Sequence, residues 1–331
     1  MANIPKPRLP RLARSRADGH SAPPKAEPKV EQVDFGGLRW VNIERPGPLD
    51  QAWLEEHFDF HPLDYEDIRS RNQRPKIDEY PDYLFIVLHF PVFDKAAGRL
   101  NAGELDIFVG PDFLVTLPNE PLPPVEYLFE RCRTSEEARE QLFSKGAGYL
   151  MYKIVDDAFD YCFPMLRKMG NKLDRLEDDI FQGRSEEVVR DISNAKQEII
   201  NFRKVIRPQR PVLRDLERTK QRYLAAEMEL YFDDIQDASE RIWDMLENYK
   251  EVVEALEDTN ESVISHRQND SLRMLAAVTM IITPLTLVAS IWGMNVGVPG
   301  GGSSGAFWLI IAALVLLGSG LVLIFRRRGL L

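Results

Sequence analysis

Charged residues are almost absent from one end of this sequence. The last 58 of its 331 residues, from Met274 onward, hold three charged side chains, and all three are arginines. The rest is rich in charge, so that the whole chain contains 28% charged residues and has a formal net charge of −10. This division excludes a uniformly water-soluble protein and indicates a soluble region followed by membrane segments.

Cysteine is scarce, and so are the signals of secretion and catalysis. Cys132 and Cys162 lie far apart, with no histidine or cysteine at metal-ligand spacing, which favours two structural thiols in a reducing compartment. The basic, proline-rich start has no apolar segment typical of a signal peptide, so the region before the membrane is expected to stay in the cytoplasm. No phosphate loop, nucleophile elbow or catalytic triad is found, and no enzyme is predicted.

Composition divides the region before the membrane into a tail and two domains. Residues 1–32 are basic and proline-rich and are predicted to be disordered; a solvated tail is favoured over contact with anionic lipid, and no nucleic-acid partner is expected. Residues 33–125 alternate short strands and helices, and residues 126–230 have a helical pattern. The predicted fold class is therefore α+β.

The boundaries expected within these domains follow from apolar runs and turn residues. Strands are predicted over 38–43, 83–90, 105–109 and 113–117, and short helices over 49–58 and 63–69. Breaks in the helical domain are predicted near Pro164, Gly183, Pro208 and Pro211.

A seven-residue apolar repeat precedes the membrane segments. Its members are Ile235, Ile242, Tyr249, Leu256 and Val263, with Ala238, Met245 and Val252 between them. Such a repeat predicts a helix that packs lengthwise against others. No proline or glycine separates the repeat from the first apolar segment. One continuous helix is therefore predicted over 231–292, about 90 Å long at roughly 1.5 Å per residue.

The other side of this predicted helix is acidic. Its carboxylates recur in steps of three and four: Asp233, Asp237, Glu240, Asp244, Glu247, Glu251, Glu254, Asp258 and Glu261. A solvated outer face is the favoured interpretation. The alternative is a negative field that concentrates cations, and this field grows when several copies surround an axis.

Two uncharged segments, 274–292 and 306–325, are each long enough to cross a hydrocarbon core of about 30 Å. Arg267 and Arg273 precede the first segment, the basic end 326–331 follows the second, and the loop 293–305 between them is uncharged. The positive-inside rule therefore predicts a multi-pass protein with both termini in the cytoplasm and the loop outside.

The first span carries a stripe of hydroxyl groups. Thr279, Thr283, Thr286 and Ser290 are spaced four, three and four residues apart, which puts them on one helical face. These side chains can bond carbonyls of the preceding turn or mediate helix packing, and the alternative is a water-lined face. Because two helices cannot enclose a pore, a water-lined face requires several copies of the chain.

A short motif follows the first span and resembles a known family signature. The segment Ile291-Trp-Gly-Met-Asn295 follows Pro284-Leu-Thr286, lies between two C-terminal spans and precedes a basic end, and it resembles the signature of the CorA family of divalent-cation channels. Three cytoplasmic segments resemble that family's N-terminal domain. They are His61-Pro-Leu-Asp-Tyr-Glu-Asp-Ile68, Asn72-Gln-Arg-Pro-Lys76 and Asp82-Tyr-Leu-Phe-Ile-Val-Leu88. The resemblance covers about residues 36–331.

The resemblance implies a homopentamer in the plasma (inner) membrane, whose long helices form a cytoplasmic funnel. It implies passive uptake of Mg²⁺, with Co²⁺ or Ni²⁺ also accepted. The second spans face the lipid bilayer and the first spans line the pore, at Asn269, Leu272, Leu275, Thr279, Thr283, Thr286 and Ser290. Gly293, Met294 and Asn295 form the selectivity motif, in which a ring of Asn295 amides receives the hydrated ion.

The resemblance also implies regulatory Mg²⁺ between subunits, held by one aspartate after a strand and one on the long helix. The matching positions are Asp94 and Asp234, with Asp233 as a close competitor, and an ordinary surface carboxylate is the alternative for each. Occupied sites are expected to hold the assembly closed, and empty sites to let it loosen.

One feature departs from the magnesium-type pattern. The loop 296–305 has no carboxylate, and in this it resembles the zinc-transporting ZntB branch, although Met294 is kept. Two alternatives therefore stay open: a zinc transporter, and a membrane-anchored coiled-coil sensor that conducts no ion.

Overall fold

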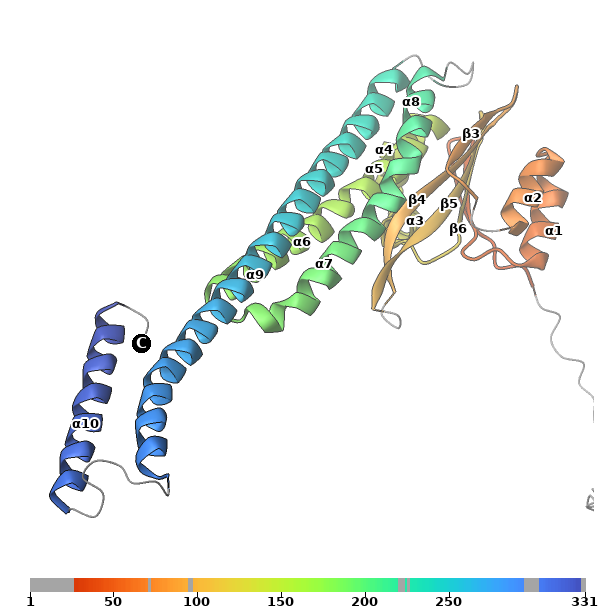
Figure 1. Ribbon diagram of the computed structural model, residues 1–331. Coiled ribbons are helices and arrows are strands. Elements are labelled where there is room, and N and C mark those ends of the chain that lie inside the picture. Colours follow the sequence, from red (N-terminus) through yellow and green to blue (C-terminus); the bar gives the residue numbers. More distant parts are fainter. Residues whose placement is uncertain are drawn as a thin grey trace, which may run out of the picture.

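The computed structural model describes residues 27–70, 73–94, 98–219, 224, 227–294 and 304–328. An α/β domain comes first, a layer of helices packs on it, and two long helices end the chain (Figure 1). The predicted α+β fold with a long helix and two C-terminal apolar helices is confirmed.

The sheet has the strand order β1-β2-β6-β5-β4-β3, and every neighbouring pair is antiparallel except β2 and β6. The strands are β1 (Glu31–Phe35), β2 (Leu38–Asn42), β3 (Lys76–Glu79), β4 (Leu84–Asp94), β5 (Arg99–Val109) and β6 (Phe113–Pro118). The sequence did not predict β1 or β3, and β1 begins inside the segment assigned to the tail. Both are edge strands with exposed charged residues, so neither shows the apolar pattern of a buried strand.

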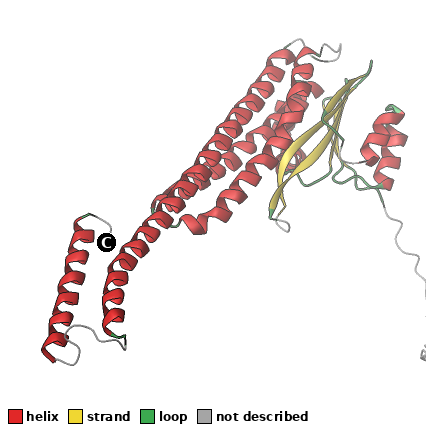
Figure 2. Cartoon of the chain, viewed as in Figure 1, coloured by secondary structure: helices red, strands yellow, loops and turns green. Residues whose placement is uncertain are grey.

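Side chains alternate between two cores on the two faces of this sheet. On one face Phe85 and Phe108 pack beneath α1 (Pro48–His57) and α2 (Pro62–Ser70). On the other face Leu84, Ile86 and Leu88 join the core of the helical layer. Figure 2 shows the sheet between its two helical covers.

Six helices of the described part of the chain form the helical layer before the long helix. They are α3 (Pro123–Thr134), α4 (Glu136–Phe143), α5 (Ala147–Asp160), α6 (Cys162–Phe181), α7 (Ser185–Ile206) and α8 (Arg210–Arg218), with a 3₁₀ turn over Arg207–Gln209. The predicted break at Gly183 is confirmed, and this glycine has a φ of 96° that other residues rarely adopt. Pro164 lies in the first turn of α6, where its missing N–H costs nothing, and the break falls at Tyr161 instead.

The long helix α9 (Met228–Trp292) is continuous over 65 residues and contacts α5, α6, α7 and α8. Its buried seam matches the predicted heptad at Ile235, Ala238, Ile242 and Leu256 and departs from it at two intermediate positions. Val253 and Leu246 are fully buried, whereas Val252 is 37% exposed and Met245 only partly buried. A straight α-helix has 3.6 residues per turn rather than 3.5, so a strict seven-residue count drifts off the buried face by about 20° per heptad.

Candidate functional site

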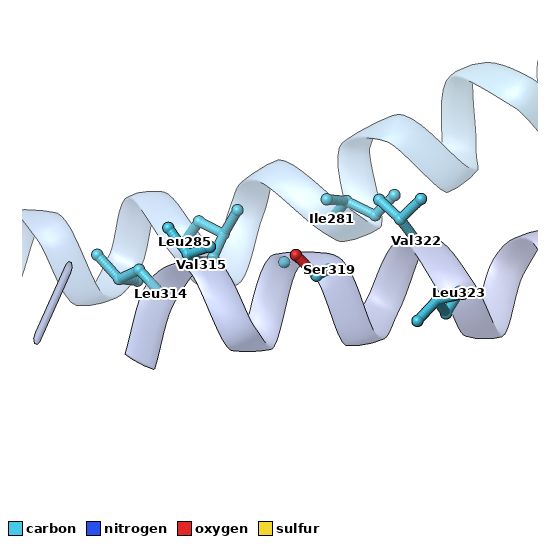
Figure 3. Close-up of a pocket in the computed structure, with 8 residues that line it drawn as sticks. Ile281, Leu285, Leu314, Val315, Ser319, Val322 and Leu323 are labelled. Atoms are coloured by element: carbon cyan, nitrogen blue, oxygen red, sulfur yellow. The ribbon is translucent and has the colours of Figure 1, made fainter. Parts of the chain in front are cut away.

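The helix α10 (Ser304–Arg327) lies beside the membrane end of α9 and runs back along it (Figure 1). The α9 side of their shared groove, of about 650 Å³, is lined by Ile281 and Leu285 (Figure 3). Leu285 faces Gly318, where an added Cβ would lie 3.4 Å from its Cδ1 atom. A side chain at position 318 would thus begin in van der Waals contact with Leu285, so the two helices pack closely at this point.

The hydroxyl stripe lies on a different face of α9. At about 100° per residue, Thr279, Thr283 and Thr286 point about 100–160° away from Ile281 and Leu285. All three are exposed within the chain, as is Ser290. The other predicted lining residues are exposed as well, with Leu272 at 62% and Leu275 at 63%. The chain therefore leaves one polar face of its first span uncovered and covers the other face with its second span.

The threonine hydroxyls have a uniform hydrogen-bond arrangement. Thr279 donates to the carbonyl oxygen of Leu275 at 2.9 Å, Thr283 to that of Thr279 at 2.8 Å, and Thr286 to that of Ile282 at 2.9 Å. The hydroxyl hydrogens are thereby directed back to the helix. The oxygen lone pairs remain on the exposed face and can accept hydrogen bonds.

The acidic side of α9 separates into two columns. In the first, Arg210 pairs with Glu240, Arg203 pairs with Glu247, and Lys250 pairs with Glu254. The second column has no ion pair among the residues that the structure describes, and all of its members are exposed: Asp237, Asp244, Glu251 and Asp258. Asp233 and Glu261, at the two ends of the first column, are also exposed and have no ion pair among the described residues. The second column is the one that lies at seven-residue steps below Thr279 and Thr286.

The motif at the end of α9 is described in part. Gly293 caps the helix, and its N–H donates to the carbonyl oxygen of Ala289 at 3.0 Å. Met294 follows and is 59% exposed. Asn295 lies outside the described residues, so its predicted role stays a prediction.

Asp94, the first predicted regulatory residue, ends β4 opposite Arg99 of β5. The carboxylate of Asp94 accepts a hydrogen bond from the Asn101 amide at 3.5 Å. It lines an open groove of about 1050 Å³ together with Tyr161 and Met165, at the junction of α5 and α6.

Asp234, the second, lies in the second turn of α9 and accepts a hydrogen bond from the Tyr152 hydroxyl at 3.0 Å. Burial raises the pKa of Tyr152, and Asp156 and Asp234 raise it further. Asp233 is exposed beside Asp234. Within one chain, Asp94 therefore lies in a groove at the end of β4, whereas Asp234 lies beside Tyr152 on the long helix.

The structure adds acidic groups that the sequence analysis did not single out. Near Tyr152, the carboxylates of Asp156, Asp157 and Asp160 offer oxygens within 4.8 Å of one another. Lys153 pairs with Asp156 at 2.9 Å and with Asp157 at 2.7 Å, so part of this charge is neutralised. These aspartates occupy positions i, i+1 and i+4 of a helix, and this spacing is the sequence signal that could have predicted the cluster.

Comparison with known proteins agrees with this geometry. The family model described as "CorA-like Mg2+ transporter protein" matches residues 35–327. The putative metal ion transporter YfjQ of Bacillus subtilis is 30% identical over 270 residues, which are 81% of either chain. The cobalt/magnesium transport protein CorA of Thermotoga maritima is 30% identical over 257 residues, covering 77% of this chain and 72% of that protein. The complete structure of the CorA magnesium transporter from Methanocaldococcus jannaschii has the same fold, with a TM-score of 0.78 at 24% identity over 92% of this chain and 95% of that chain.

Proposed function

This chain belongs to the CorA-like Mg²⁺ transporter family, and from that premise we propose that it is a homopentameric channel for passive Mg²⁺ uptake that also accepts Co²⁺ and Ni²⁺. The observation that carries the proposal is that two faces of α9 have different surroundings. Its apolar face is covered by α10, and its hydroxyl face is left open. In a ring of copies the hydroxyl faces converge on the axis, while the α10 helices form the outer wall toward lipid.

The chemistry of the open face suits a hydrated cation. Mg²⁺ sheds its waters reluctantly, and those waters direct their hydrogens outward. A lining for such an ion therefore needs acceptors. Thr279, Thr283 and Thr286 offer hydroxyl oxygens whose hydrogens are already donated to the helix. Asn295 adds an amide oxygen at the predicted outer mouth, where a neutral ring receives the ion without holding it too tightly to release it.

The free acidic column supports the same pathway on the cytoplasmic side. Asp237, Asp244, Glu251 and Asp258 are exposed, whereas three acids of the other column, Glu240, Glu247 and Glu254, are paired with basic side chains. Copies of one column arranged around an axis create a negative potential that concentrates divalent cations. With both termini in the cytoplasm, this field draws ions inward from the pore.

Feedback by intracellular Mg²⁺ completes the proposal. Asp94 of one subunit and Asp234 of its neighbour are proposed to share a Mg²⁺ ion, since the Asp234 carboxylate is exposed and Asp94 is partly exposed at the edge of an open groove. An occupied site ties neighbouring subunits together and holds the pore closed. Loss of intracellular Mg²⁺ releases the tie.

The test is competitive flux through the reconstituted full chain, with Mg²⁺, Co²⁺, Ni²⁺ and Zn²⁺ offered in turn, for the wild type and Asn295→Ala. Mg²⁺ flux that Asn295→Ala reduces at least tenfold, or about 1.4 kcal/mol, supports the proposal. Ser319→Ala is the matched control, since it removes a polar side chain from the α9–α10 groove rather than the open face. Unchanged flux in Asn295→Ala removes that residue from its role.

The same assay separates the alternatives. Zn²⁺ uptake driven by a pH gradient, with no Mg²⁺ flux, would identify a zinc transporter. Absence of flux for all four ions would identify a membrane-anchored sensor.

A further inference from the structure

An aromatic groove of about 430 Å³ lies between the end of α1 and the turn that joins β3 to β4. One wall is formed by Phe58 and Phe113, whose ring centroids are 5.1 Å apart. The other wall is formed by His61 stacked on Tyr80, with centroids 5.6 Å apart. The groove is on the sheet face covered by α1 and α2, away from α9, and is therefore separate from the pathway described above (Figure 1).

Buried hydrogen bonds hold the second wall in place. The carboxylate of Asp64, which is fully buried, accepts from the hydroxyls of Tyr80 at 2.9 Å and Tyr83 at 2.7 Å. The Tyr83 hydroxyl in turn accepts from the backbone N–H of His61 at 2.7 Å. A groove whose aromatic side chains are already fixed loses little conformational freedom when a ligand enters.

The rim of the groove is acidic. Asp59 and Asp82 line it, both are exposed, and neither has an ion pair among the described residues. Fixed aromatic ridges with an acidic rim match one class of ligand in particular, a polyproline II segment with basic residues. Such a segment presents every third residue on one face and has little conformational entropy to lose.

The chain contains a segment of this kind in residues 4–11, Ile-Pro-Lys-Pro-Arg-Leu-Pro-Arg. In a three-residue period, Pro7 and Pro10 share a face with Ile4, and Arg8 and Arg11 share the next. Residues 1–26 hold six basic side chains and a single acid, Asp18, so their charge is complementary to the rim.

The first described residues also lie within reach of the groove. Val30 packs in the same apolar cluster as Phe58 and Phe113, and the N–H of Lys29 donates to Asp50 of α1 at 2.6 Å. The groove lies at the other end of α1, about 15 Å away for a ten-residue helix. Lys29 lies eighteen positions after Arg11 along the chain, and a flexible link of that length spans roughly 23 Å.

We propose that this groove is a polyproline-binding site, and that its occupant is residues 4–11 of the same chain. Pro7 and Pro10 lie on the aromatic walls, and Arg8 and Arg11 face Asp59 and Asp82. A short tether gives an effective concentration on the order of millimolar, so weak contacts are enough to keep the segment docked.

The test uses a fluorescent peptide of residues 2–16 and the full-length protein in detergent, compared with a variant that lacks residues 2–26. Anisotropy is expected to show about tenfold tighter peptide binding to the shortened variant, because the tethered segment no longer competes. A peptide with Pro7→Ala and Pro10→Ala keeps its charge and is expected to bind at least about tenfold more weakly, because the alanines lose the polyproline conformation and its apolar contacts.

Variants of exposed residues test the role of the acidic rim without changing the core. Asp59→Asn with Asp82→Asn is expected to weaken binding about fivefold and to reduce its salt dependence. Glu56→Gln with Glu66→Gln is the matched control, since it removes two exposed charges of α1 and α2 that do not line the groove. The proposal is overturned if the alanine peptide binds as well as the natural one, or if the full-length and shortened proteins bind equally. Binding of the peptide only to vesicles containing anionic lipid would likewise overturn it, and would assign the segment to the membrane surface.

Discussion

The hydroxyl of Thr283 donates to the carbonyl oxygen of Thr279, 2.8 Å away and one turn earlier in α9. Both side chains lie on the face of the helix that α10 leaves open. The bond therefore turns a donor inward and presents an acceptor outward. The two interpretations of the stripe, bonding to helix carbonyls and a water-lined face, are therefore compatible, because a hydroxyl that donates to the helix still has an exposed oxygen that can accept from water.

Replacing Thr283 by valine removes the acceptor and keeps the side-chain shape. We expect Thr283→Val to lower Mg²⁺ flux about fivefold, which corresponds to about 1 kcal/mol for one lost hydrogen bond to a hydration water. Thr283→Ser keeps the hydroxyl and is expected to conduct nearly normally. Flux through the valine variant equal to that through the serine variant would show that the open face does not contact the ion's waters.

Removing both proposed regulatory carboxylates should uncouple the assembly from Mg²⁺. For Asp94→Asn with Asp234→Asn, the Mg²⁺ concentration that gives half-maximal protection from proteolysis is expected to rise at least about tenfold, since a hard cation loses two charged oxygen ligands. Asp233→Asn is the control, because Asp233 is the exposed neighbour of Asp234. A shift in that control alone would transfer the role to Asp233.

The contact of Leu285 with Gly318 predicts a steric test of the paired spans. Gly318→Leu is expected to lower the thermal stability of the full chain, at a cost of about 1–3 kcal/mol for overpacking. Gly320→Leu should be tolerated, because a Cβ there meets nothing within 4 Å. Leu285→Ala combined with Gly318→Leu should recover much of the loss. Equal effects of the two glycine variants would mean that the paired helices do not pack as described.

Asp106 on β5 predicts a pH dependence of folding stability. Burial raises its pKa well above the usual value, the nearby Glu104 raises it further, and its Oδ1 atom has no hydrogen-bond partner in the described part of the chain. Because the folded state holds this proton more tightly than the unfolded state, the contribution of Asp106 is fully present below its unfolded pKa of about 3.9 and is lost as pH rises.

Asp106→Asn is therefore expected to be more stable than the wild type at pH 8, with the difference shrinking toward pH 4, as measured by thermal unfolding of the full chain. Glu66→Gln, at an exposed position outside the groove, should follow the wild type at every pH. A difference between Asp106→Asn and the wild type that is constant across this pH range would contradict the prediction.

Much of the fold could be predicted because its signals are local. The family resemblance based on the segment ending in Asn295 is confirmed by the match over residues 35–327. Strands β4, β5 and β6 were predicted from apolar runs. β4 and β5 extend beyond their predicted ranges toward their shared hairpin, where polar and exposed residues such as Arg99 and Asn101 interrupt the apolar pattern. Edge strands β1 and β3 were missed because partners on one side only bury few of their side chains. The heptad count put Val252 in the seam because period 3.5 and period 3.6 differ little over a few turns.

The sequence by itself determined the two apolar spans, the continuity of the helix that leads into the first, and the common face of the four hydroxyls. Each depends on residues a few positions apart and on the fixed rise and twist of a helix. Only the tertiary structure decided which face of α9 is covered by α10, and which of its acids are neutralised. Those outcomes depend on contacts such as Leu285 with Gly318 and Arg203 with Glu247, between residues 33 and 44 positions apart, which no local pattern encodes.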